Sequence, residues 1–118
     1  MNLQIETSSL GANTTALHIT GEVDVFTSTS LKLAINSAIN GGTDRLVLFL
    51  SDVEYLDSTG LGVLIGALKK MREKDGSLIL IGPTSRVLRI FDLTGLVSVF
   101  SIYQSLDEAD SGRAVPAK

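Results

Sequence analysis

The chain has 118 residues, of which 44% are hydrophobic and 19% are charged, and its formal net charge is −3 at pH 7. This length and composition are typical of one globular domain and exclude a disordered or membrane-spanning chain. The lack of cysteine excludes disulfides and thiolate chemistry, and the single histidine excludes a zinc site built on two histidines.

Charge and leader signals narrow the expected location and partners. The first residues lack the basic and then apolar segments of a secretory signal, so we expect a cytoplasmic protein. Basic residues are concentrated only at positions 69–74, near the end of a predicted helix, where they complement the helix dipole. Nucleic-acid-binding proteins gather Lys and Arg on one face, so no nucleic acid is expected as a partner. The longest uncharged apolar stretch, residues 60–68, is too short to cross a bilayer, so no membrane is expected either.

The first predicted element is a β-hairpin. Alternation of polar and apolar residues predicts strands over residues 3–5 and 15–20, with a turn over residues 8–13 between them. His18 follows this alternation and is interpreted as an ordinary residue on the face of the sheet. Residues 21–24 interrupt the pattern, so the second strand is predicted to end before them.

The rest of the chain alternates helices with strands. Apolar residues at helical spacing predict helices that begin near Thr27, Asp57 and Thr84, and a capping-box spacing from Ser105 to Glu108 predicts a short fourth helix. Apolar runs predict strands over residues 45–50, 78–81 and 97–102.

Strands that alternate with helices produce parallel crossovers, so this order predicts an α/β fold. We expect a mixed sheet of about five strands that starts with the antiparallel hairpin, together with about four helices. One domain is predicted over residues 2–110, and the polar residues 111–118 are predicted to be a frayed tail.

The second predicted helix has two different sides. Its buried stripe is predicted to consist of Leu61, Leu64, Ile65, Leu68 and Met71. The opposite side then carries glycines at i and i+4, each of which costs roughly 1 kcal/mol relative to alanine in an exposed helix. Either another backbone approaches these glycines closely, or they pack under loops of this same domain. The outward residues are Thr59, Gly62, Val63, Gly66 and Lys70.

This helix begins in the segment YLDSTGLGVLIG, residues 55–66, where Asp57 or Ser58 is predicted to cap the first turn. The segment lacks the G-x-S-x-G pattern of a nucleophile elbow, and the chain contains no phosphate-binding loop. Asp57 has no evident second aspartate for acid catalysis, although spacing alone leaves a pairing with Asp24 or Asp52 open. We therefore expect no enzyme activity, no catalytic residues, no metal site and no cofactor.

A family resemblance rests on three features taken together. They are the Asp57-Ser58-Thr59-Gly60-Leu61-Gly62 run after a buried strand, the upstream Ile19-Thr20-Gly21-Glu22-Val23-Asp24 run, and the order of strands and helices. Over residues 2–110 the chain resembles a STAS domain and, more narrowly, the bacterial anti-sigma factor antagonists. One local departure is the apolar character of residues 25–27.

The resemblance implies partner switching in transcription regulation, controlled by phosphorylation. In that family the serine at the position of Ser58 is phosphorylated by an anti-sigma factor that is also a GHKL-type serine kinase. A metal-dependent serine phosphatase removes the phosphate. The unmodified antagonist binds the anti-sigma factor and so frees the sigma factor. Thr59 is a minor candidate for modification, and the expected partner-binding residues are Glu22, Asp24, Asp57, Ser58, Thr59, Gly62, Val63 and Gly66.

The charge of a phosphate fits this role. Free amides and the dipole favour an anion at a helix N-terminus, so phosphorylation of Ser58 is expected to leave the fold intact. Near Asp24 and Asp57 the same charge opposes binding to a partner through repulsion and desolvation. The alternative is an unmodified STAS scaffold that binds a nucleotide or another protein in a signalling complex.

Overall fold

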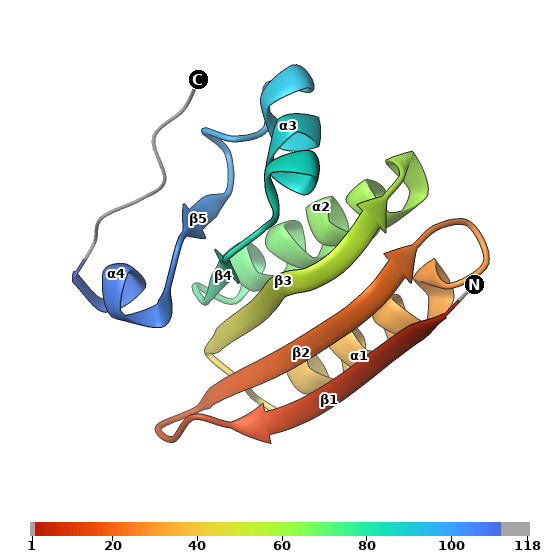
Figure 1. The fold of residues 1–118 in the computed structure, drawn as a ribbon. Coiled ribbons are helices and arrows are strands. Elements are labelled where there is room, and N and C mark those ends of the chain that lie inside the picture. The colour runs from red at the N-terminus through yellow and green to blue at the C-terminus, as the bar shows by residue number, and fades with distance from the viewer. Residues whose placement is uncertain (1, 112–118) are drawn as a thin grey trace.

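A five-stranded sheet forms the centre of the molecule (Figure 1). The computed structural model describes residues 2–111, and its strands lie in the order β1-β2-β3-β4-β5. β1 and β2 are antiparallel, whereas each later pair of neighbours is parallel, which confirms the predicted α/β fold class. The strands are β1 Leu3–Ser9, β2 Thr14–Val23, β3 Arg45–Leu56, β4 Ser77–Ile81 and β5 Ser101–Tyr103.

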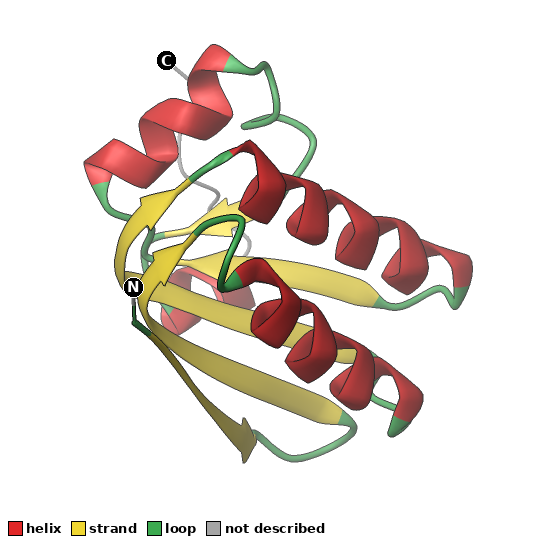
Figure 2. Ribbon diagram, turned by 90° about the vertical axis from the view of Figure 1, so that its right-hand side faces the viewer, coloured by secondary structure: helices red, strands yellow, loops and turns green. Residues whose placement is uncertain are grey.

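Helices cover the two faces of the sheet unequally. α1 and α2 lie side by side on one face (Figure 2), and α3 packs against the same large apolar core. The short α4 packs on the other face over a smaller cluster that includes Val47 and Ile79. Successive side chains of a strand point to opposite faces, so Leu46 and Leu48 join the large core. The helices are α1 Ser28–Asn40, α2 Ser58–Glu73, α3 Ser85–Leu93 and α4 Leu106–Ser111.

Strand β2 continues through residues 21–23, where the sequence predicted a break. Gly21 has φ +117°, and a methyl group there would collide with the backbone carbonyl of Asn2. The pairing of β2 with β3 shifts register between Gly21 and Glu22. A glycine absorbs this irregularity, so the strand stays paired up to Val23.

The other strand bounds also differ from the sequence prediction. β3 runs six residues beyond the predicted end at residue 50, because Val53 and Leu56 are buried although their neighbours are polar. β5 begins only at Ser101 instead of residue 97. The residues before it form a turn that buries Phe100 edge-on against Phe91, with ring centroids 5.2 Å apart.

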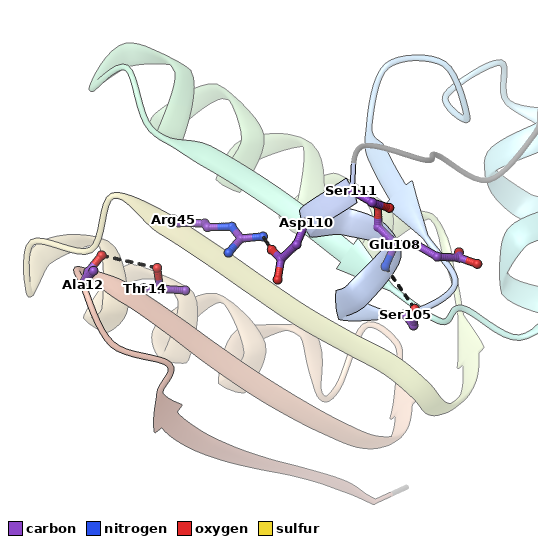
Figure 3. A network of polar contacts seen from close by, with 7 residues as sticks. All are labelled: Ala12, Thr14, Arg45, Ser105, Glu108, Asp110 and Ser111. Atoms are coloured by element: carbon purple, nitrogen blue, oxygen red, sulfur yellow. Dashed lines mark hydrogen bonds and ion pairs between the residues drawn. The ribbon is translucent and has the colours of Figure 1, made fainter.

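Short polar contacts order the start of α4 and link the helix to β3 (Figure 3). The Glu108 amide donates to Ser105 Oγ at 3.2 Å, so Ser105 caps α4 as the spacing predicted. The reciprocal bond differs from a strict capping box, because Glu108 Oε2 accepts from the Gln104 amide at 3.1 Å and not from that of Ser105. Arg45 and Asp110 form an ion pair at 2.8 Å. The predicted tail lies outside the described residues except for Ser111, the last residue of α4.

Candidate partner-binding site

The first turn of α2 is capped by Asp57. Its backbone is extended, with φ −97° and ψ −175°, and its Oδ1 accepts a hydrogen bond from the Gly60 amide at 3.0 Å. This geometry decides between the two predicted caps. Ser58 is the first residue of the helix and is exposed, so its hydroxyl is not needed to cap α2.

The loop between β2 and α1 reaches the start of α2 because β2 and β3 end at the same edge of the sheet (Figure 1). The Asp57 amide donates to the Val23 carbonyl at 3.0 Å and joins the two segments directly. Residues 22–24 therefore lie beside the segment that carries Ser58, as the family resemblance implied.

Asp24 organises this loop from the inside. It is only 4% exposed, and its Oδ1 accepts hydrogen bonds from the amides of Phe26 at 2.8 Å and Thr27 at 3.0 Å. Burial by itself raises the pKa of the Asp24 carboxyl, but the hydrogen bonds from Thr27 and Phe26 outweigh it and hold the pKa below its ordinary value of 3.8. Among the described residues, Asp24 Oδ2 has no hydrogen-bond partner.

A shallow hollow of about 420 Å³ lies at this loop. It combines acidic residues with large apolar side chains, of which Phe26 is 77% and Val25 is 61% exposed. Within residues 2–111 no group of three or more His, Asp or Glu side chains has the geometry to bind a metal ion. The lining residues are Glu22, Asp24, Val25, Phe26, Tyr55 and Asp57.

A second hollow, of about 310 Å³, lies between α1 and α2 and is called the groove below. A methyl group added at Gly62 or Gly66 would meet nothing within 4 Å in the part of the chain that the structure describes. The alternative that these glycines pack under the domain's own loops is therefore wrong. Lys70 Nζ donates to Asn36 Oδ1 at 2.8 Å and bridges the two helices. The lining residues are Lys32, Ile35, Asn36, Thr59, Gly62, Val63, Gly66, Ala67 and Lys70.

The prediction that Ile65 belongs to the buried stripe of α2 is wrong. Ile65 is 43% exposed, whereas Leu64 is 1% exposed. Successive helical residues are turned by about 100°, and the buried arc is centred near Leu64. Ile65 lies beyond the edge of this arc, while Ala67, which the predicted stripe omitted, lies within it and is 3% exposed.

Lys32, Asn36 and Tyr55 line the two hollows but were not singled out from the sequence. Lys32 and Asn36 belong to α1 and reach the groove only because α1 packs beside α2. Tyr55 belongs to the polar half of β3, which the sequence did not identify as strand. No local pattern marks these residues.

Comparison with known proteins places the chain in a family. The model of the STAS domain matches residues 5–109. This protein is a member of the STAS domain family. Across 114 residues it is 32% identical to an anti-sigma-B factor antagonist of Listeria monocytogenes, covering 97% of this chain and 100% of the relative. The predicted family is thereby confirmed.

Two further comparisons agree with this assignment. The STAS protein is 36% identical over 102 residues to an anti-sigma-B factor antagonist of Bacillus subtilis, which covers 86% of this chain and 92% of the relative. It superimposes on an anti-sigma factor antagonist from Mycobacterium paratuberculosis with a TM-score of 0.78 and 29% identity, over 94% and 93% of the two chains. Among residues 2–111, no helix has the length and apolar character needed to cross a bilayer.

Proposed function

We propose that this protein is an anti-sigma factor antagonist whose binding is switched off by phosphorylation at Ser58. The observation that carries the proposal is the placement of Ser58. It is exposed on the first turn of α2, and Asp57 performs the capping. Directly beside it lie residues 22–27, which carry Glu22 and Asp24 and are called the acidic loop below. The relatives that are 32% and 36% identical over most of the chain are anti-sigma-B factor antagonists, which supports the same function.

The partner is an anti-sigma factor that is also a GHKL-type serine kinase, and a metal-dependent serine phosphatase reverses the modification. The antagonist has no catalytic activity of its own and acts in the cytoplasm. It contacts the kinase through both hollows and through the start of α2 between them. The proposed contact residues are Glu22, Asp24, Asp57, Ser58, Thr59, Gly62, Val63 and Gly66.

The switch acts on binding and leaves the fold intact. A phosphate on Ser58 lies near the free amides of the first turn of α2, where the helix dipole favours an anion. The same phosphate adds about −1.5 to −2 charges beside Asp57 and the acidic loop. In a closed interface this charge is desolvated and repelled, so binding is lost while the free domain stays folded.

The test uses the GHKL-type anti-sigma kinases encoded in the source genome, each purified and incubated with this protein and magnesium ATP. Intact-mass measurement is expected to show one added phosphate on the wild type and on Thr59→Ala, and none on Ser58→Ala. Ser58→Ala keeps its affinity for the kinase. Ser58→Asp binds at least about tenfold more weakly, a loss of about 1.4 kcal/mol, with an unchanged melting curve.

Three results would contradict parts of the proposal. Phosphate on Ser58→Ala but not on Thr59→Ala would move the modification to Thr59. A lowered melting temperature of Ser58→Asp would show that the charge acts on folding. No phosphate from any of the kinases, combined with binding of a nucleotide or of a different protein, would support the unmodified scaffold instead.

A further inference from the structure

Phe26 is exposed to an unusual degree for a large apolar side chain. At 77% it is the most exposed large hydrophobic residue in the described part of the chain, and its neighbour Val25 is 61% exposed. Tyr55, 45% exposed, lines the same hollow from β3. Clustered apolar side chains on the surface of a small domain mark a contact site, since water around them is unfavourable.

The backbone beneath Phe26 is held by a closed set of hydrogen bonds. Asp24 Oδ1 accepts from the amide of Phe26, and the Thr27 hydroxyl donates to the Glu22 carbonyl at 2.7 Å. The Asp24 amide in turn donates to Thr27 Oγ1 at 2.9 Å. A partner that binds Phe26 therefore does not have to order the loop. Aromatic side chains on preorganised backbone are typical of the residues that dominate binding energy.

The charges around Phe26 indicate the chemistry of the partner. The ionisable carboxylates that line this hollow are Glu22, Asp24 and Asp57, and no Lys or Arg of residues 2–111 lines it. Asp24 is buried, so the carboxylates that a partner can reach are the partly exposed Glu22 and Asp57. A surface of this kind is complementary to basic side chains. The occupant that fits is an apolar recess with Lys or Arg at its rim.

We infer that Phe26 is the apolar anchor that docks this protein on its anti-sigma factor. The inference rests on the proposed function. Asp57 belongs both to this hollow and to the cap next to Ser58. A phosphate on Ser58 therefore adds its charge at the edge of the surface around Phe26, where it interferes with the docking of the anchor.

The experiment is a calorimetric titration of the unphosphorylated protein with the anti-sigma kinase that binds the wild type. Phe26→Ala is expected to weaken binding about thirtyfold, which corresponds to about 2 kcal/mol. The matched control is Leu93→Ala, because Leu93 is 73% exposed but lines a different hollow on α3. Its affinity is expected to stay within about twofold of the wild type. Both variants keep the wild-type melting temperature.

Two variants that place opposite charges at position 26 test the expected basic rim of the partner. Both Phe26→Lys and Phe26→Glu remove the anchor, but Phe26→Lys is expected to bind more weakly because it repels a basic partner. Weaker binding by Phe26→Glu would overturn the basic rim. Wild-type affinity of Phe26→Ala would overturn the anchor and leave the proposed function standing. Lack of binding by the wild type to every anti-sigma kinase would overturn both.

A second copy of this chain is the remaining occupant of the surface around Phe26 to test. Sedimentation of the wild type and of Phe26→Ala is expected to give the same mass for both. A dimer that becomes a monomer in Phe26→Ala would show that a second copy of the chain covers Phe26, and the inference would be wrong.

Discussion

The two sides of helix α2 use glycine for different reasons. On the buried side, a methyl group at Gly60 would lie 2.5 Å from Val23 Cγ1 and 2.6 Å from Leu56 Cδ1. On the open side, a methyl group at Gly62 or Gly66 would meet nothing within 4 Å among the described residues. Packing therefore requires Gly60, whereas nothing in the fold requires the other two, and their cost in helix stability points to function.

The largest effect is expected from the contrast between the buried side of α2 and its exposed residues. It compares Leu64 with Ile65, which are adjacent on α2. Leu64→Ala is expected to lower the free energy of unfolding by about 2 to 5 kcal/mol, because it leaves a cavity at a residue that is 1% exposed. Ile65→Ala is expected to lower it by about 1 kcal/mol or less, since Ile65 is 43% exposed. Urea unfolding measures both. Equal losses would show that the buried arc of α2 extends to Ile65.

The next largest effect is expected from Gly60→Ala. The added methyl group must displace Val23 and Leu56 in a packed core, which costs about 1 to 3 kcal/mol of unfolding free energy. Gly62→Ala serves as the control on the same helix, because it adds the same group in open space. A neutral effect of Gly60→Ala would mean that the core at the start of α2 relaxes freely, and the contrast between the two sides would fail.

The order of the elements could be predicted from the sequence because it depends on local patterns. Apolar runs and helical spacing predicted the strands and helices, and parallel neighbours followed from their alternation. The polar half of β3 was missed because Ser51, Asp52 and Glu54 obscure the strand pattern there. Ile65 was misplaced because a helical stripe indicates a direction but not the width of the buried arc.

The candidate site was likewise predicted only in part. The family resemblance implied that residues 22–24 lie near Ser58, and the structure gives the reason, since the parallel strands β2 and β3 end at the same edge of the sheet. The sequence did not show that Asp24 is buried and accepts hydrogen bonds from the backbone amides of its own loop, since these bonds form only in the fold. The groove also required the packing of α1 on α2, which determines its far wall.

A smaller effect is expected from the cap of α2. Asp57→Ala removes the acceptor of the Gly60 amide and should lower the unfolding free energy by about 1 kcal/mol. Thr84→Ala is the matched control, because Thr84 caps α3 by accepting from the Val87 amide at 3.2 Å. Thermal unfolding should show similar losses, while only Asp57→Ala changes binding to the anti-sigma factor. An unchanged stability of Asp57→Ala would mean that Ser58 can replace the cap.

The smallest expected change in stability has the opposite sign. Gly62→Ala and Gly66→Ala should each raise the unfolding free energy by about 0.5 to 1 kcal/mol, because alanine restricts the unfolded chain and nothing opposes its methyl group. The same methyl groups narrow the groove between α1 and α2, so binding to the anti-sigma factor should weaken. Urea unfolding and calorimetry on the same samples separate the two effects. If both variants were more stable and bound with wild-type affinity, the open side of α2 would have no part in docking, and the contact would be confined to the start of α2 and the acidic loop.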